Sequence, residues 1–174
     1  MKKLFRRVIP HSRREKLIVA AALVSALLLL AADQVTKAWF VRNFELYQSI
    51  PLVPGWLNFT YVRNLGAAWS MLSGYVWLLL GFGLLAGAGI IVFFRKLAES
   101  CPERYFALLM VISGIIGNCF DRAFHGAVID FIHVHYYNIW HYPVFNVADM
   151  AICTGVGIFI LSSLFRKSPE KDKK

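Results

Sequence analysis

The chain has 174 residues, a formal net charge of +9 and 58% hydrophobic residues, with a mean hydropathy of +0.56. This composition is too apolar for a water-soluble protein, and it predicts a single integral membrane domain over residues 1–174. The net positive charge alone would allow a nucleic-acid partner, so the distribution of that charge along the chain decides its meaning.

Four apolar stretches are long enough to cross a hydrocarbon layer about 30 Å thick. They are residues 17–40, 75–94, 105–120 and 145–165. We therefore expect a mainly α-helical membrane protein with four transmembrane helices, in which the connections 41–74 and 121–144 lie on the same side of the membrane.

Fifteen of the nineteen Lys and Arg residues fall in the N-terminal arm 1–16, the 95–104 connection and the tail 166–174. Cytoplasmic segments carry an excess of Lys and Arg, so both termini are predicted to be cytoplasmic and the two long connections extracytoplasmic. The basic arm suits contact with anionic membrane lipids, and no nucleic-acid partner is expected.

The first apolar stretch follows a basic segment and therefore also has features of a cleavable signal peptide. However, Asp33, Gln34 and Lys37 come after the apolar run, and no A-x-A cleavage site follows it. We predict that this stretch is a retained membrane anchor.

Both outer connections contain segments typical of β-strands. In the first, Pro51, Pro54 and Gly55 are turn signals, and WLNFTYV at 56–62 is rich in β-prone residues. In the second, residues 126–137 alternate between apolar and polar side chains. We expect a small β-sheet on the outer membrane surface.

Carboxylates gather at one predicted depth of the membrane. Of the outer-side acidic residues, those at or just inside the membrane boundary are Asp33, Asp121, Asp130 and Asp149. A transmembrane Asp is costly and is a functional candidate by default. Asp33 has Lys37 at i+4, which predicts a local ion pair, and Asp121 precedes Arg122, which indicates a neutralised helix end. Asp130 and Asp149 have no such local cation.

Two close carboxylates in a partly dry site do not both ionise cheaply, so one keeps a proton while the other stays charged. This state suits amide hydrolysis, in which the charged carboxylate takes a proton from water and the protonated one hydrogen-bonds the scissile carbonyl. Such chemistry needs no metal and no cofactor.

Three alternatives compete with a carboxylate pair. His125, His133, His135 and His141 include an HxH spacing typical of metal ligands. On a strand, however, His133 and His135 point away from Asp130, and we expect interfacial packing for them. A Ser/Lys dyad on Lys37 has no supporting spacing. A small transporter or ion-conducting subunit would place polar groups at several depths, which the second span does not.

Five ordered motifs carry a family resemblance across nearly the whole chain. They are DQVTK at 33–37, NLGAAW at 64–69, GNCFDR at 117–122, VIDF at 128–131 and FNVAD at 145–149. With these motifs the chain resembles the prolipoprotein signal peptidases, or signal peptidase II, which are bacterial membrane aspartyl peptidases. Trp69 replaces the usual Phe of the second motif, which implies altered packing beside Gly66.

The resemblance implies a catalytic dyad of Asp130 and Asp149. It assigns substrate positioning or active-site support to a further set, namely Asp33, Asn64, Gly66, Asn118, Asp121, Arg122 and Asn146. It also implies four transmembrane helices with a small outer β-cradle and a short outer helix.

The implied reaction is removal of the signal peptide from diacylated prolipoproteins, by cleavage just before the lipidated cysteine. The implied location is the bacterial cytoplasmic (inner) membrane, with the active site near the extracytoplasmic face. We expect a monomer whose partners are its prolipoprotein substrates and membrane lipids. Cys101, Cys119 and Cys153 show no disulfide framework.

Overall fold

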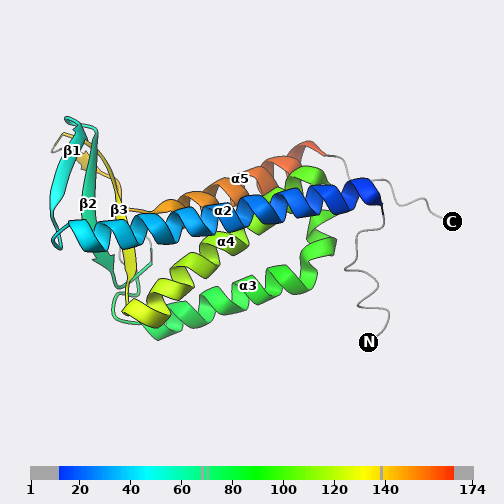
Figure 1. Ribbon diagram of the computed structural model, residues 1–174, viewed down its shortest axis with the longest axis horizontal. Helices are drawn as coiled ribbons and strands as arrows, with labels where there is room; N and C mark the ends of the chain where they lie inside the picture. Colours follow the sequence, from blue (N-terminus) through cyan, green and yellow to red (C-terminus); the bar gives the residue numbers. More distant parts are fainter. Residues whose placement is uncertain (1–11, 68, 70, 138, 167–174) are drawn as a thin grey trace.

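The computed structural model describes residues 12–67, 69, 71–137 and 139–166. Within these residues, four helices are long and apolar enough to cross a membrane: α2 (Arg13–Asn43), α3 (Val76–Ala98), α4 (Pro102–His125) and α5 (Val147–Phe165). The helices form a bundle that carries a small β-sheet at one end (Figure 1). The predicted mainly helical fold, with four membrane-span helices and a small β-sheet, is confirmed.

Helices α2, α3 and α4 extend beyond the apolar stretches from which they were predicted, because local caps set their ends, whereas α5 begins two residues after its predicted start. The side chain of Ser12 accepts a hydrogen bond from the backbone of Glu15 and starts α2 four residues before the predicted span. At the other end of the bundle, Gly126 takes a left-handed conformation and ends α4 beyond the predicted boundary. The chain then turns back into the sheet.

The sheet is antiparallel, with strand order β1-β2-β3-β4 among the described residues. Its strands are β1 (Ser49–Val53), β2 (Leu57–Asn64), β3 (Val128–Tyr136) and β4 (Trp140–His141). Both predicted strands are confirmed, as β2 and β3. Strand β1 was not predicted, because Pro51 indicated a turn; β1 is an edge strand, where a missing N–H is tolerated.

The pairing of β2 with β3 joins the two long connections and brings them over the helix ends. Val62 lies opposite Asp130, and Asn64 lies opposite Val128. The ring of Phe131 stacks on Phe40 of α2, with ring centroids 4.3 Å apart. Strand β3 is therefore fixed to the bundle, and its first residues, up to Phe131, are buried.

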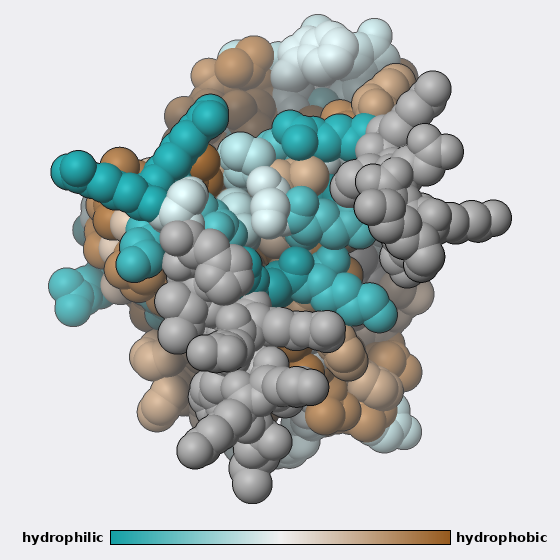
Figure 2. All heavy atoms as spheres, turned by 90° about the vertical axis from the view of Figure 1, so that its right-hand side faces the viewer, coloured by the Kyte–Doolittle hydropathy of each residue, from teal (hydrophilic) through white to brown (hydrophobic). Residues whose placement is uncertain are grey.

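Hydrophilic side chains gather at the opposite end of the bundle, where α2 begins and α5 ends (Figure 2). The described basic residues of the N-terminal arm, the 95–104 connection and the start of the tail all belong to this end. They are Arg13, Arg14, Lys16, Arg95, Lys96, Arg104 and Arg166. The charge asymmetry predicted along the sequence is thus also an asymmetry between the two ends of the bundle.

Helix α4 is the central helix and packs against α2, α3 and α5. A Cβ added at Gly114 would meet the carbonyl oxygen of Ala148 and lie 2.6 Å from Ile152 on α5. A Cβ at Gly117 would lie 2.5 Å from a carboxylate oxygen of Asp33 on α2. Small residues on α4 therefore allow the close helix approach that assembles the sheet-side end of the bundle.

We expect Gly114→Ala to lower the free energy of unfolding by about 1–3 kcal/mol, because the added methyl group would force α4 and α5 apart. Gly89 on α3 is the matched control, since nothing lies within 4 Å of a Cβ added there. Unfolding of both variants in detergent micelles measures the effect. Equal stability of Gly114→Ala and Gly89→Ala would contradict this packing.

The expected short outer helix falls in the stretch between β2 and α3. Residues 68 and 70 lie outside the described residues. Trp69 and Leu72 have φ values of 53° and 54°, and Gly74 has 90°. These three left-handed residues do not belong to a right-handed helix.

Candidate active site

Asn146 and Asp149 together form the start of α5. The side chain of Asn146 accepts from the backbone N–H of Asp149 at 2.9 Å, and Asp149 Oδ2 accepts from the backbone N–H of Asn146 at 3.2 Å. This reciprocal arrangement is a capping box. The two polar residues at the beginning of an apolar helix therefore have a local structural role, which also fixes the direction of the Asp149 carboxylate.

Asn118 on α4 holds the other oxygen of Asp149. Its Nδ2 donates to Asp149 Oδ1 at 2.7 Å, while its Oδ1 accepts from Lys37 Nζ at 3.1 Å and from Asn146 Nδ2 at 3.1 Å. Because a single side-chain amide joins α2, α4 and α5, Asn118 fixes the position of Asp149 relative to the bundle.

Asp130 on β3 is held by two asparagine amides. Asn146 Nδ2 donates to its Oδ1 at 2.7 Å, and Asn64 Nδ2 donates to its Oδ2 at 3.0 Å. Asp130 is only 2% exposed. Burial, together with the nearby charge of Asp149, raises the pKa of Asp130 from 3.8 to about 8, although both amide donors favour the ionised form. Asp130 therefore keeps a proton at neutral pH.

Beneath these residues lies a buried ion cluster formed by Lys37, Asp33 and Asp121. Lys37 Nζ lies 2.8 Å from each carboxylate, and its side chain is 2% exposed. The predicted Asp33–Lys37 pair is confirmed. Each carboxylate also accepts from a backbone N–H: Asp33 from Ala148 at 2.9 Å, and Asp121 from Ile129 at 3.1 Å. The cluster thus joins α2 and α4 to the start of α5 and to β3.

The predicted neutralisation of Asp121 by Arg122 is wrong. The Arg122 guanidinium donates to the carbonyl oxygens of Gly66 at 3.1 Å and Asn118 at 3.4 Å, and Asp121 pairs with Lys37 on another helix. Consecutive residues on a helix point about 100° apart, so Asp121 faces the bundle while Arg122 faces the loop after β2. Arg122 therefore positions that loop, in which Gly66 N donates to Asn64 Oδ1 at 2.9 Å.

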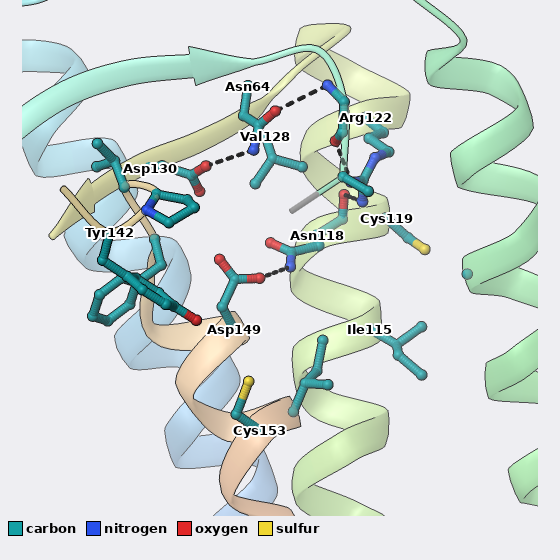
Figure 3. A pocket seen from close by; sticks show the side chains of 17 residues that line it. Asn64, Ile115, Asn118, Cys119, Arg122, Val128, Asp130, Tyr142, Asp149 and Cys153 are labelled. Carbon is teal, nitrogen blue, oxygen red and sulfur yellow. Dashed lines mark hydrogen bonds between the residues drawn. The ribbon is translucent and has the colours of Figure 1, made fainter. Parts of the chain in front are cut away.

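A cavity of about 300 Å³ opens beside the two aspartates (Figure 3). Asp130 and Asp149 approach it from β3 and α5, and Asn118 lies between them on α4. The lower part of the cavity is apolar and includes Ile115, Ile152 and the small residue Gly83 on α3. The cavity therefore combines a polar, carboxylate-bearing end with an apolar end between the helices.

The residues expected from the sequence all gather here. Those that line the cavity are Asn64, Gly66, Asn118, Arg122, Asp130 and Asp149. Asp33, Asp121 and Asn146 lie behind the cavity and hold the lining residues in place through the hydrogen bonds above.

Several contributors were not included in the expected site. Lys37 was assigned only to Asp33, although an isolated lysine in an apolar helix is itself a signal of function. The cavity wall at 142–145 and the two thiols of Cys119 and Cys153 were also missed. Their sequence gives no local signal, because they reach the cavity only through the packing of α4, α5 and the extended chain beside β3.

The histidines lie elsewhere on the sheet. The rings of His133, His135 and His141 have centroids 5.1 to 5.7 Å apart, and none of them lines the cavity. As predicted, the alternation of β3 separates His133 and His135 from Asp130, and His141 lies on β4. Over the described part of the chain, no group of three or more His, Cys, Asp or Glu residues is arranged to hold a metal ion. Cys101, Cys119 and Cys153 are free thiols in the structure.

The fold and the site define a multi-pass membrane protein with two carboxylates facing one cavity at the sheet-bearing end of its helices. Comparison with known families agrees. A sequence model of the family described as signal peptidase (SPase) II matches residues 25–165. The chain belongs to the signal peptidase II family of aspartyl peptidases, which confirms the resemblance carried by the five motifs.

Named relatives and solved structures support this assignment. A lipoprotein signal peptidase of Geobacter metallireducens is 41% identical over 158 residues, covering 89% of this chain and 93% of that protein. One from Shewanella sp. strain MR-4 is 43% identical over 154 residues, covering 84% and 87%. A bacterial membrane enzyme solved by the in meso method is 30% identical with a TM-score of 0.79, covering 89% of this chain and 94% of that chain. The family assignment favours a peptidase over the transporter alternative.

Proposed function

We propose that Asp130 and Asp149 are the catalytic pair with which this signal peptidase II removes signal peptides from diacylated prolipoproteins. The observation that carries the proposal is the shared cavity, into which two carboxylates from β3 and α5 point. Asn146 contacts both of them, through its side chain to Asp130 and through its backbone to Asp149. A pair fixed to one common residue is well suited to act on one substrate bond.

The proposed roles follow from the environments of the two groups. Asp130 holds the proton, because burial and the charge of Asp149 raise its pKa to about 8. Asp149 carries the negative charge, which the N-terminus of α5 favours. A water between them would give a proton to Asp149 and attack the scissile carbonyl, whose oxygen would accept a hydrogen bond from protonated Asp130. Asp149 then gives this proton to the departing amine as the C–N bond breaks, which completes the cleavage.

The apolar end of the cavity supports a membrane-embedded substrate. Gly83 on α3, Ile115 on α4 and Ile152 on α5 give the cavity that holds Asp149 an apolar lining between the helices. A signal peptide is itself a membrane helix, and a lipid attached to the residue after the scissile bond would also stay in the hydrocarbon layer. Both substrate parts could therefore remain in lipid while the peptide bond reaches the carboxylates.

For orientation, we propose that the sheet and the cavity face the extracytoplasmic side of a bacterial inner membrane. The described basic residues at the opposite end of the bundle, including Arg13, Arg14 and Arg95, support this by the positive-inside rule. We also propose that the monomer is active, because the described residues of one chain supply both carboxylates and their supporting groups.

The proposal is tested by incubating the purified protein in detergent micelles with a diacylated prolipoprotein and identifying the products by mass spectrometry. We expect one cut, directly before the lipidated cysteine, and no effect of a metal chelator. The same precursor without the lipid is the matched control and should remain uncut. Absence of cleavage, or a cut at another bond, would refute the proposed function.

The pH dependence of cleavage tests the assignment of the proton to Asp130. Since the protonated form is the active one, kcat/KM should fall about tenfold per pH unit above pH 8, the pKa of this group. The amide of Asn64 favours ionised Asp130, so Asn64→Ala should raise that pKa and move the alkaline limb to higher pH. A limb that stays in place or moves to lower pH would contradict the assignment.

A further inference from the structure

One wall of the catalytic cavity is an extended segment of backbone, residues 142–145, that follows β4 and runs beside β3. Tyr142 N donates to Val134 O at 2.9 Å. Phe145 N donates to Ile132 O at 3.0 Å, and Phe145 O accepts from Ile132 N at 2.8 Å. Both backbone groups of Phe145 are therefore turned toward β3.

Tyr142 and Phe145 both bond to β3, but two residues lie between them on this side and only His133 lies between their partners, so the chain bulges at residues 143 and 144. The N–H and C=O of Val144 are not paired with β3. Among the described residues, neither group has a hydrogen-bond partner. Val144 is half-buried and lines the cavity together with both aspartates. A free donor and a free acceptor thus lie at the edge of the cavity, two residues before Asn146.

The substrate, in turn, needs hydrogen-bond partners for the backbone groups around the bond to be cut. A peptide bond within a helix has its carbonyl engaged in a helical hydrogen bond, so the chain around the scissile bond must be extended before water can attack. Extension leaves backbone N–H and C=O groups unpaired near the membrane interior, where unpaired groups are costly. Pairing with a strand edge satisfies them and aligns the bond to be cut.

We propose that the substrate segment flanking the scissile bond binds as an added β-strand to the backbone of Val144, with hydrogen bonds to its N–H and C=O. This inference rests on the proposed function and adds to it a binding mode. The sheet order supports it, because the 142–145 segment lies on the side of β3 opposite to β2 and has no further strand beyond it within the described residues. Val144 is here a positioning residue that acts through its main chain.

The first test compares Val144→Pro with Val144→Ala in the full-length protein. Proline removes the N–H and fits an extended segment, whereas alanine keeps the N–H and shortens the side chain. Loss of one hydrogen bond in a partly dry site corresponds to roughly tenfold, so kcat/KM for a diacylated lipopeptide should fall about tenfold or more with Val144→Pro. Val144→Ala keeps this hydrogen bond, so its kcat/KM should fall clearly less than that of Val144→Pro. Similar values for both variants, or near wild-type activity of Val144→Pro, would overturn the proposal.

A second test uses the wild-type protein and therefore does not depend on the folding of a variant. Diacylated lipopeptides carry a single N-methyl group at successive amides near the scissile bond. Methylation removes a substrate N–H, so it should reduce cleavage most at the one amide that donates to the Val144 carbonyl. Val144→Pro keeps this carbonyl, so methylation at the same amide should reduce its remaining activity further. A uniform reduction, or none, would overturn the pairing. Failure of wild-type protein to cut the unmethylated peptide would instead refute the proposed function.

Discussion

Asp149→Asn is expected to reduce the rate of lipopeptide cleavage by about 10³-fold or more, because an amide does not take a proton from water. Asp130→Asn should have a similar effect, since an amide would supply a weaker hydrogen bond to the scissile carbonyl than a carboxylic acid does. Both replacements keep the shape of the side chain. In Asp149→Asn, the amide oxygen of the new side chain would still accept from the backbone N–H of Asn146, so the capping of α5 is retained.

The two aspartates are proposed to act together in one step, so the effects of replacing them should not add. The variant with both replacements should be no slower than either single variant, because each single change already removes the shared step. Glu45→Gln is the matched control, since Glu45 is an exposed carboxylate in the same outer connection as Asn64. Rates come from product formation with equal amounts of folded protein. If Asp130→Asn or Asp149→Asn kept activity within tenfold of wild type, that residue would not be catalytic.

Lys37→Met is expected to have the largest effect on stability. It would leave the carboxylates of Asp33 and Asp121 buried without the cation that now lies 2.8 Å from each of them. Removing one partner of a buried ion pair costs about 3–5 kcal/mol, because the remaining charge is left uncompensated. We expect a decrease of this size in the free energy of unfolding, measured in detergent micelles.

Two comparisons test whether the lost stability of Lys37→Met comes from the unpaired buried carboxylates and not simply from removing a lysine. Lys96→Met on the exposed surface of α3 should change stability by less than about 0.5 kcal/mol. Combining Lys37→Met with Asp33→Asn and Asp121→Asn should restore at least half of the lost stability, because no buried charge then remains unpaired. If Lys37→Met were no more destabilising than Lys96→Met, the buried cluster would have no structural importance.

Local sequence patterns were sufficient for much of the architecture. Helices α2 to α5 follow from the length and hydropathy of four stretches, and their number and order are as predicted. Strands β2 and β3 follow from alternation and β-prone residues. Asp130 and Asp149 stood out because no cation lies near them in the sequence, and five motifs in order indicated the family. The capping box of α5 was not predicted, although Asn146 and Asp149 have the required spacing.

Only the tertiary structure decided how the site is held together. Asp33 accepts from Ala148, which is 115 residues away along the chain, and Asn64 donates to Asp130 across 66 residues. Lys37 is adjacent to Asp33 on one helix face, yet it also pairs with Asp121, while Arg122 turns to the loop at Gly66. Hydropathy and periodicity determine which face of an element is apolar, because that property belongs to each element by itself. Which polar atoms meet depends on how elements distant in sequence are rotated and packed against one another, and no single segment contains that information.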